Sequence, residues 1–440
     1  MKTLKSKKMK KQVVIIGGGF AGINLSLALA NDRRFHVTLV DRNNYNYFPP
    51  LLYQVATGFL EASNISYPFR KLFHHKKNLR FRLGELLKIV AEENKVLLST
   101  GEVHYDYLVI ATGTESNYFG LENIRKAALP MKTVDDALEM RNYLLQKTEE
   151  ATVTEDMAER KKLTTIVIAG GGPTGVEVAG MLAEMRANIL EKDYPELTGR
   201  NVSIYLVDGA PTLLAPMSRE AQEYAYETLT KMGVEVLLNK QVKDYVDDSV
   251  IFADGETIQT KMLFWTAGVT ASVFEGLSKE SYGRGRRVLV DAYNKVQGTE
   301  NIYAIGDTAL LTSDTNFPQG HPQLAQPAIQ QGRNLAGNLK ALVKGERLNP
   351  FVYHDKGSMA IIGRSKAAAD IPRPRMRLKG FLAWVMWLFV HLFSLISYRN
   401  RIKTMYNWTL AYFTKDQALR MIIRPVKANQ NKDIVPEEGK

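Results

Sequence analysis

Two apolar runs in the chain are each followed by a glycine-rich turn and a helical pattern, at an offset of 153 residues. The first reads VVIIGGGFAG from Val13 to Gly22, and the second reads IVIAGGGPTG from Ile166 to Gly175. In such a unit the first glycine allows a tight turn, the second lets the backbone approach a pyrophosphate, and the third lets the helix approach the strand. One copy is weak evidence, but two copies in matching context predict two dinucleotide-binding units.

Each unit continues with an apolar strand that ends in an aspartate. The strand at 36–40 ends at Asp41, which follows Gly17 by 24 residues, a spacing that suits a carboxylate on a ribose. The alternative is an aspartate that only caps a turn. The strand at 202–207 ends at Asp208, but the segment 191–200 delays this acid beyond the usual spacing. That delay counts against a simple motif match in the second unit.

A further apolar strand, at 301–305, is followed by Gly306 and Asp307. A chain that returns here to the first unit places Asp307 at the carboxyl end of the first sheet. The order of elements predicts an α/β protein with two Rossmann-like dinucleotide-binding domains, the second inserted into the first, and a C-terminal helical extension. The expected bounds are 1–125 and 286–345 for the outer domain, 126–285 for the inserted domain and 346–440 for the extension.

The extension contains an almost continuous apolar run from Phe381 to Tyr398. As a helix it spans about 27 Å, which is marginal for a hydrocarbon core of about 30 Å. A second segment, at 402–413, repeats apolar residues at helical spacing. We therefore expect two amphipathic membrane-anchoring helices that lie in the interface, the alternative being a buried core or dimer helix. Three tryptophans suit the headgroup boundary: Trp384, Trp387 and Trp408.

The formal charge of +12 is concentrated near the two ends of the chain. Residues 1–12 carry six lysines and residues 371–415 carry eight basic residues, without an acid in either segment, so the remainder is near −2. Such ends suit an anionic membrane surface, nucleic acid or plain solvent. The apolar run beside the second cluster favours the membrane over nucleic acid. The first cluster leads directly into a strand, so no secretory signal is expected and the body should stay in the cytoplasm.

The chain has no cysteine, which excludes disulfides, iron–sulfur ligation and thiolate chemistry. Disulfide reductases and sulfide:quinone oxidoreductases need redox cysteines and are therefore excluded. The seven histidines show no spacing typical of metal ligands, so no metal site is predicted. We interpret His74 and His75 as part of a solvated basic patch.

The motifs as a set resemble the flavoproteins with two dinucleotide-binding domains, in which the first domain holds FAD and the second NAD(P)H. Three further segments make the chain similar to the type II NADH dehydrogenases: FPPLLYQVAT at 48–57, GGGPTGVE at 170–177 and AQPAIQQG at 325–332, followed by the aromatic tail. These are non-pumping NADH:quinone oxidoreductases of respiratory membranes. Pro327 stands where the family usually has another residue.

The resemblance implies a peripheral enzyme that passes a hydride from NADH to FAD and reduces a membrane quinone, menaquinone or ubiquinone. It also implies a homodimer on the cytoplasmic face of the inner membrane, bound to anionic lipid and not to nucleic acid. The cofactor-binding residues would be Gly17, Gly19, Phe20, Ala21, Gly22, Asp41, Arg42, Gln54, Ala111, Thr112, Gly113, Gly170, Gly172, Thr174, Gly175, Glu177, Asp208, Ala267, Gly268, Gly306, Asp307, Ala325 and Gln326. The catalytic residues would be Glu177, Gln326 and Gln330, and the quinone-binding residues Gln326, Gln330 and Gln331.

Two acidic residues of the second unit bear on this assignment. Asp208 favours NADH over NADPH, because a carboxylate accepts hydrogen bonds from a ribose 2′-hydroxyl but repels a 2′-phosphate, and no Lys or Arg follows within ten residues. Glu177 lies in the first helical turn, where its counterpart in the first unit is the neutral Asn24. An acid there gains about 0.3 to 1 kcal/mol from the helix dipole. The resemblance implies instead that Glu177 positions the nicotinamide.

Three glutamines bear on the quinone site. Gln326 and Gln330 share a helix face if Pro327 lies in the first turn of a helix, and Gln331 follows directly. Amides can hydrogen-bond quinone carbonyls without adding charge to an apolar tunnel. The alternative is that they cap neighbouring backbone. Two other functions also stay open, namely an NADH-dependent reductase of a small redox protein and a flavoprotein that only binds a partner.

Overall fold

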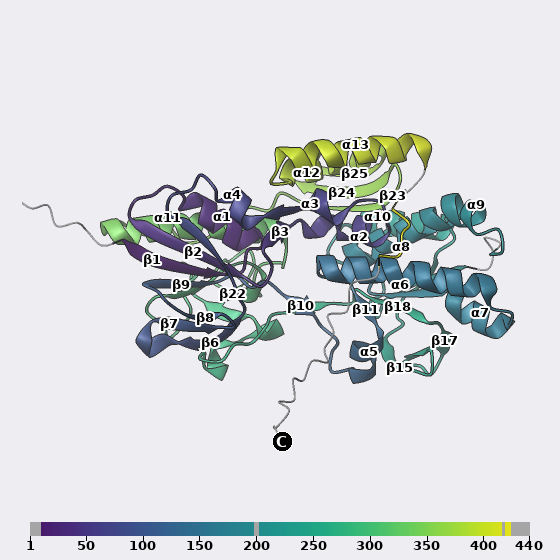
Figure 1. Cartoon of the computed structure of the whole chain (residues 1–440), viewed down its shortest axis with the longest axis horizontal. Helices are drawn as coiled ribbons and strands as arrows, with labels where there is room; N and C mark the ends of the chain where they lie inside the picture. Colours follow the sequence, from purple (N-terminus) through teal and green to yellow (C-terminus); the bar gives the residue numbers. More distant parts are fainter. Residues whose placement is uncertain (1–9, 198–201, 416–418, 424–440) are drawn as a thin grey trace, which may run out of the picture.

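Two parallel sheets form the two halves of the molecule, and helices α12 (Phe381–Ser394) and α13 (Tyr398–Thr414) lie across one side of it (Figure 1). The computed structural model describes residues 10–197, 202–415 and 419–423. Most of the predicted N-terminal lysine cluster therefore lies outside the described residues.

The first sheet has the strand order β21-β9-β1-β2-β5, with all neighbours parallel. Its strands are β1 (Lys11–Ile16), β2 (Phe35–Asp41), β5 (Leu79–Leu83), β9 (Tyr107–Ile110) and β21 (Ile302–Ala304). Their near-continuous apolar sequences fit a sheet that is covered on both faces. Helices α1 (Phe20–Ala28) and α11 (Ala325–Lys344) pack together over one face. Because β21 belongs to this sheet, the chain returns to the first domain as predicted.

The second sheet repeats this order as β11-β18-β12-β13-β14, again parallel. Its strands are β11 (Leu129–Pro130), β12 (Thr165–Ala169), β13 (Ser203–Val207), β14 (Glu235–Leu237) and β18 (Met262–Trp265). An antiparallel three-stranded sheet precedes β9 in one unit and β18 in the other. These sheets are β6 (Leu86–Val90), β7 (Lys95–Leu98) and β8 (Gly101–His104), and β15 (Val242–Val246), β16 (Ser249–Phe252) and β17 (Thr257–Gln259). The internal repeat thus extends far beyond the glycine motifs.

Two short antiparallel strands carry the chain between the domains, β10 (Glu115–Ser116) and β19 (Val269–Thr270). The predicted domain bounds at 125 and 285 lie a short distance beyond these strands. After β10, α5 (Glu122–Ala127) packs on β15 of the inserted domain. The crossing continues with two helices, α6 (Val134–Val153) and α7 (Met157–Thr164). Helix α6 begins with a capping box between Thr133 and Asp136.

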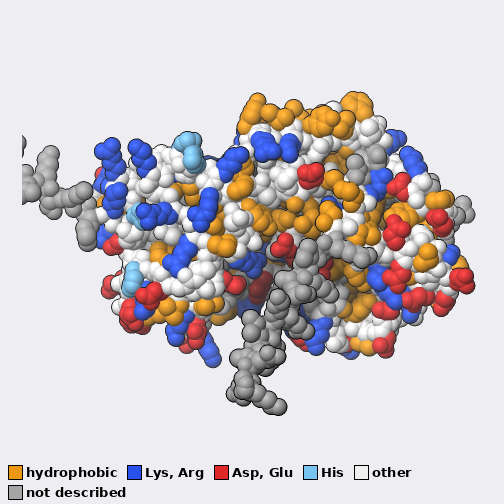
Figure 2. Space-filling model, in the orientation of Figure 1, with side chains coloured by type: hydrophobic (Ala, Val, Ile, Leu, Met, Phe, Trp, Pro, Cys, Tyr) orange, Lys and Arg blue, Asp and Glu red, His pale blue; other side chains and the backbone are white. Residues whose placement is uncertain are grey.

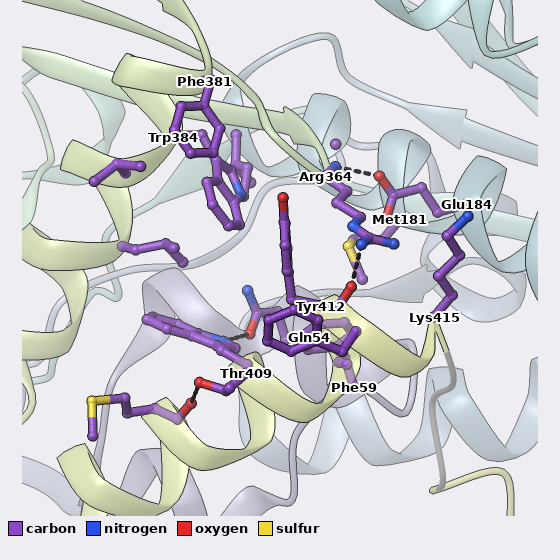
Figure 3. Close-up of a pocket in the computed structure, with 18 of the residues that line it drawn as sticks. Gln54, Phe59, Met181, Glu184, Arg364, Phe381, Trp384, Thr409, Tyr412 and Lys415 are labelled. Atoms are coloured by element: carbon purple, nitrogen blue, oxygen red, sulfur yellow. Dashed lines mark hydrogen bonds between the residues drawn. The ribbon is translucent and has the colours of Figure 1, made fainter.

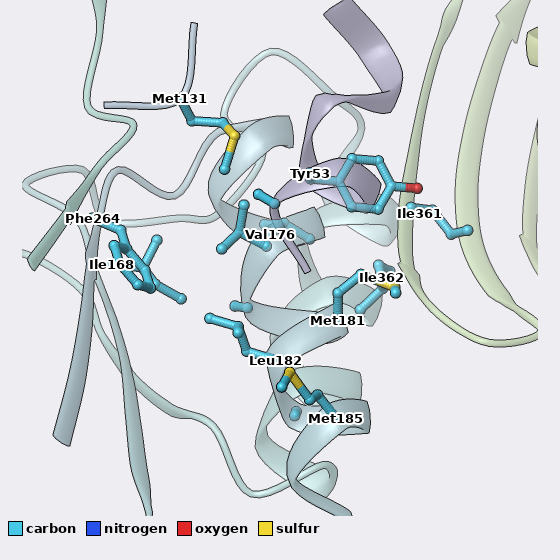
Figure 4. Close-up of a cluster of buried hydrophobic side chains, with 14 of the residues drawn as sticks. Tyr53, Met131, Ile168, Val176, Met181, Leu182, Met185, Phe264, Ile361 and Ile362 are labelled. Carbon is cyan, nitrogen blue, oxygen red and sulfur yellow. The ribbon is translucent and has the colours of Figure 1, made fainter. Parts of the chain in front are cut away.

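A three-stranded antiparallel sheet precedes the C-terminal helices: β23 (Ser358–Gly363), β24 (Lys366–Pro372) and β25 (Arg375–Gly380). The hydrophobic pattern does not predict this sheet, because β25 is mostly exposed and basic. Strand β23 packs against α8 (Pro173–Met185), where a Cβ on Gly180 would overlap the carbonyl oxygen of Ile362. Figure 4 shows the apolar cluster around α8, in which Tyr53, Met181 and Ile361 come from three different parts of the chain.

The two predicted C-terminal helices are present, and the first ends at Ser394 rather than near Tyr398. Among the described residues, no helix is long and apolar enough to cross a membrane. The predicted position at the headgroup boundary is wrong for two tryptophans, because their side chains are buried: Trp387 is 0% and Trp408 is 8% exposed. Trp387 stacks on His391 at 3.9 Å between ring centres, which holds it in the core rather than at the outer surface.

A small layer between residues 45 and 72 supports the C-terminal helices. The remaining helices are α2 (Leu52–Ala56), α3 (Ala62–Ile65), α4 (Phe69–Leu72), α9 (Glu191–Asp193) and α10 (Arg219–Lys231), and the remaining strands are β3 (Tyr45–Tyr47), β4 (Ser66–Pro68), β20 (Val288–Val290) and β22 (Ala309–Leu311). Strands β3 and β4 pair, and α3 packs against α13. Asn400 of α13 donates a hydrogen bond from Nδ2 to the carbonyl oxygen of Ser66 at 2.9 Å. The C-terminal helices are thereby fixed to the first domain.

We expect Gly180→Ala to lower the free energy of unfolding by about 1 to 3 kcal/mol, because the added methyl group forces β23 away from α8. The control is Gly337→Ala in α11, where a Cβ meets open space and alanine raises the free energy of unfolding by about 0.5 to 1 kcal/mol through helix propensity. Urea denaturation of the full chain measures both. Equal changes in the two variants would contradict the close packing of α8 and β23.

Candidate functional site

The two glycine turns have the same geometry. Gly17 and Gly170 have φ angles of +105° and +112°, which a residue with a side chain rarely adopts. A Cβ on Gly22 would overlap the carbonyl oxygen of Gly17, and a Cβ on Gly175 would overlap that of Gly170. Each helix can therefore begin directly over the turn only because Gly22 or Gly175, the third glycine of the motif, has no side chain. The N-terminal N–H groups of the helix then point to the carboxyl edge of the sheet.

The two strand-end aspartates also occupy equivalent positions. Each aspartate lies one residue beyond the last pair of its two strands, directly opposite the first glycine of the turn. Asp41 accepts a hydrogen bond from the backbone N–H of Gly18 at 2.6 Å, and Asp208 accepts one from the N–H of Gly171. Burial raises the pKa of Asp41, while backbone hydrogen bonds oppose that shift. The long connection before Asp208 does not displace the acid, so its late spacing is no evidence against the motif.

The residues around both turns fit a bound dinucleotide. A Cβ at Gly19 or Gly172 would meet nothing within 4 Å, so both glycines face open space where a pyrophosphate needs a close approach. Thr112 follows the strand beside the first turn, and its buried Oγ1 has no hydrogen-bond partner in the described part of the chain. A buried hydroxyl without a partner is rare in folded proteins and fits a ligand contact.

A cavity of about 570 Å³ lies beside the second turn. Three of the predicted residues line it: Gly170, Asp208 and Ala267. Lys240 and Lys243 line it as well, although neither is expected from the ten residues that follow Asp208. They reach the cavity because β13 and β14 are neighbours in the sheet. Lys240 forms ion pairs with two acidic residues of the next hairpin, which compensate its charge.

The other predicted cofactor-binding residues lie on or beside the strands and helices that form the two turns. Phe20 begins α1, and its ring meets Phe48 edge-on at 5.7 Å between ring centres. Ala21 packs against Gly306, whose added Cβ would lie 3.0 Å from that of Ala21. Ala111 and Gly113 flank Thr112, Ala267 and Gly268 follow β18, Thr174 lies in the first turn of α8, and Ala325 begins α11.

A wide cleft of about 1130 Å³ lies at the crossing between the domains, and four cationic side chains line it: Arg42, Arg125, Lys132 and Arg286. The charges of Lys132 and Asp307 interact, and Asp307 lies just after β21, the strand that returns to the first domain. Burial raises the pKa of Asp307, and the charges of Lys132 and Arg287 oppose this. Burial lowers the pKa of Lys132, and the charge of Asp307 opposes it. No sequence spacing connects Lys132 to Asp307, because they belong to different domains.

Glu177 lies where three parts of the chain meet. Its helix, α8, contacts α2 of the first domain and β23 of the C-terminal sheet. The side chain is 8% exposed, and burial raises its pKa well above the usual range, although a hydrogen bond from the Ile361 backbone opposes the shift. The charge of Glu177 also contributes to raising the pKa of Tyr53, so the two groups are close enough to interact. Burial therefore favours the neutral form of this carboxyl group.

The three glutamines of α11 all bind backbone groups. Gln326 and Gln330 donate from Nε2 to carbonyl oxygens of the segment 354–357, each at 2.9 Å. Gln331 accepts a hydrogen bond from the N–H of Gly306 at 2.6 Å. The first two share a face, and Pro327 lies in the first turn of α11. This geometry matches the capping alternative, and contact with a quinone stays a prediction.

An apolar cavity of about 490 Å³ lies between α8, α12 and α13, and we call it the α12–α13 cavity (Figure 3). Its wall is mostly apolar and aromatic, including Phe59, Met181, Trp384, Leu388, Leu392 and Tyr412. Gln54 reaches it from the first domain, and two hydrogen bonds of 2.8 Å fix its amide: Nε2 donates to the Tyr53 hydroxyl and Oε1 accepts from Trp408 Nε1. The cavity therefore joins the predicted Gln54 to both C-terminal helices.

One end of the α12–α13 cavity is polar. The backbone N–H of Arg364 donates to the carboxylate of Glu184, and its guanidinium donates to the carbonyl oxygen of Tyr412. The guanidinium also lies 4.3 Å from the centre of the Tyr412 ring. Burial raises the pKa of Glu184. Figure 3 shows Arg364 between Glu184 and Tyr412. None of these three residues is expected from the sequence motifs.

Comparison with known proteins places this geometry in a family. The pyridine nucleotide-disulphide oxidoreductase family matches residues 11–332, and the NDH2 C-terminal domain matches residues 355–415. Two Mycobacterium tuberculosis proteins, the type II NADH:quinone oxidoreductases NdhA and Ndh, are 37% and 34% identical to this chain. Each alignment covers 92% of this chain, with 87% of NdhA and 89% of Ndh.

The fold is also that of a solved structure. NDH2 from Plasmodium falciparum in complex with NADH superposes with a TM-score of 0.86 at 22% identity, over 94% of this chain and 100% of the other. Fold, domain matches and the mycobacterial relatives agree over nearly the full length. The chain therefore belongs to the type II NADH:quinone oxidoreductases.

Proposed function

We propose that the protein oxidises NADH where its two nucleotide domains meet and reduces a membrane quinone that enters through the α12–α13 cavity. The activity and the cofactors FAD and NADH, predicted from the sequence, are those of the family to which the chain belongs. One observation carries the quinone route: Gln54 lines an apolar cavity bounded by both C-terminal helices. The preceding residue, Tyr53, lies close enough to Glu177 for the two groups to interact electrostatically.

The chain's own residues divide the work between two sites. The backbone of the turn at 17–22, Asp41 and Thr112 would hold FAD, and the turn at 170–175 with Asp208 would hold NADH. Bound FAD supplies a two-electron acceptor for a hydride. The protein contributes orientation, and the buried surroundings of the junction exclude water.

Glu177 acts in this proposal as a positioning residue for the nicotinamide. Its protonated carboxyl group can donate one hydrogen bond and accept another without placing a negative charge near the reductant. The helix-dipole alternative requires an ionised side chain, and burial disfavours that form.

Gln326, Gln330 and Gln331 have a supporting place in the proposal. Gln326 and Gln330 fix the loop at 354–357, and Gln331 binds the N–H of Gly306, one of the predicted cofactor-binding residues. A direct contact with the quinone, its identity as menaquinone or ubiquinone, and a homodimer stay predictions from the resemblance.

The outer face of α12 and α13 supports a peripheral position on a membrane. Large apolar side chains of these helices that do not line the α12–α13 cavity are exposed: Leu382, Val390, Phe393, Ile402, Tyr406 and Leu410. Figure 2 shows a hydrophobic band along the edge of the molecule where α12 and α13 lie. An exposed apolar surface of this kind favours a lipid-soluble acceptor over a soluble redox protein. The bound bilayer surface would be the cytoplasmic one.

We expect Glu177→Leu to slow flavin reduction by saturating NADH roughly ten- to a hundredfold, because leucine can neither donate nor accept the hydrogen bonds of a neutral carboxyl group. Anaerobic stopped-flow spectroscopy of the holoenzyme measures the bleaching of the flavin by NADH and its recovery on adding quinone. A wild-type enzyme that does not bleach and recover would refute the activity, and equal bleaching rates would refute the role of Glu177.

Stability is the control for that variant. Burial in the folded protein raises the pKa of Glu177 above its value of about 4.5 in the unfolded chain. Unfolding then releases a proton, so this group's contribution to the free energy of unfolding falls as pH rises from that value toward its raised folded pKa. The side chain of Glu177→Leu does not titrate and lacks this slope, so the difference in free energy of unfolding should shift in favour of the variant as pH rises above about 4.5.

We expect Leu388→Trp to raise the KM for a short-chain quinone about tenfold by filling the α12–α13 cavity. The rate with ferricyanide, a small water-soluble acceptor, should not change. The matched control is Val390→Trp on the exposed side of the same helix, outside the cavity. If the two variants behaved alike with quinone, the cavity would not be the quinone route.

We expect the triple variant Leu382→Glu, Phe393→Glu and Tyr406→Glu to lose more than tenfold in partitioning to phosphatidylcholine vesicles, because each buried apolar side chain contributes about 1.5 to 3 kcal/mol. The flavin should stay bound, since these residues lie outside the cavity and the core. Cosedimentation measures the partitioning. The control replaces Val153, Met157 and Val273, exposed apolar residues elsewhere, with Glu; an equal loss in both variants would reject the anchor.

A further inference from the structure

A second surface of the molecule faces the same side as the apolar helices. It is the stretch from Arg70 to Arg82, RKLFHHKKNLRFR, which begins with α4, ends in β5 and contains six Lys or Arg residues, two His and no acid. We call it the α4 basic segment. Most of its charged side chains are exposed, namely Arg70, Lys71, His74, His75, Lys77 and Arg80. The proposed NADH and quinone chemistry does not use it.

The cations of the α4 basic segment have no carboxylate partner. Within the described residues, none of its lysines or arginines forms an ion pair, whereas Lys95, Lys240 and Lys261 each bind two acids. Two of its cations instead lie over aromatic rings: Arg70 over Phe81 at 5.4 Å and Lys71 over Tyr67 at 5.8 Å. The rings support the stems of these side chains and leave their charge available to an external anion.

The position of the segment relative to α13 is fixed by the backbone. Strand β4 leads directly into α4, and Asn400 of α13 donates its hydrogen bond to Ser66 of that strand. In Figure 1, α4 lies on the same side of the molecule as α12 and α13. Figure 2 shows basic and histidine side chains along that edge, beside the hydrophobic band. Arg399 and Lys403 of α13 are exposed as well.

We infer that the α4 basic segment is a second membrane-contact surface, which binds the anionic headgroups of the bilayer on which α12 and α13 lie. An apolar face made of two helices leaves the enzyme free to tilt about them. A charged contact on the first domain removes that freedom and sets the molecule flat on the membrane. Each basic side chain near an anionic leaflet contributes attraction, which falls off within a Debye length. This inference rests on the proposed peripheral position.

The test uses the full-length holoenzyme with Lys71→Glu and Lys77→Glu. Partitioning is measured by cosedimentation with phosphatidylcholine vesicles, with and without phosphatidylglycerol. We expect the variant to lose about thirtyfold or more in partitioning to phosphatidylglycerol vesicles at low salt, and to match wild type on pure phosphatidylcholine. High salt should remove the difference. The matched control is Lys161→Glu with Lys279→Glu, two exposed lysines elsewhere that change the net charge equally.

Three outcomes would overturn the inference. The control variant could lose as much as the test variant, so that only net charge matters. The test variant could keep wild-type partitioning to phosphatidylglycerol vesicles. It could also keep that partitioning and lose binding to an oligonucleotide, which would assign the surface to nucleic acid. Failure of wild type to bind pure phosphatidylcholine would instead refute the apolar anchor, so the two proposals fail separately.

Discussion

The structure depends on a contact between backbones, made where the first turn of a helix lies on the glycine that ends the preceding strand. At Gly22 and Gly175 no side chain fits between helix and turn. This approach points the helix N-terminus at the carboxyl edge of the sheet and sets the strand-end aspartate beside the turn in both domains. The two domains differ further along the helix. Asn24 hydrogen-bonds to its own helix at Phe20, whereas Glu177 lies at the junction with other parts of the chain.

The junction around Glu177 is assembled from segments that are far apart in the sequence. Helix α2 comes from the first domain, α8 from the inserted domain and β23 from the C-terminal sheet. Their apolar side chains form one cluster, and burial there raises the pKa of the Glu177 carboxyl group because an ionised form would lack solvation. The same packing that holds the three parts together therefore sets the chemical state of the side chain we assign to the nicotinamide.

The sequence predicts features that depend on local pattern. The glycine turns, Asp41, Asp208 and the return of the chain at Asp307 are each encoded within a short stretch, and the fold class, family, activity and cofactors are confirmed. Features that depend on distant contacts are missed. The charge of Lys132 acts on Asp307 across a domain junction, β25 is too exposed to show a hydrophobic pattern, and Trp408 is buried where it hydrogen-bonds to Gln54 of the first domain. The roles assigned to single site residues stay predictions.

The hydrogen bond between Trp408 and Gln54 joins the second C-terminal helix to the first domain. One partner belongs to a helix whose opposite face is exposed and apolar, and the other to the layer that borders the predicted flavin site. Displacing α13 would remove the Trp408 donor from the buried amide oxygen of Gln54, and a buried acceptor without a hydrogen bond lowers the stability of the fold. The C-terminal helices are therefore not a detachable appendage, because a single hydrogen bond joins the position of α13 to that of a predicted cofactor-binding residue.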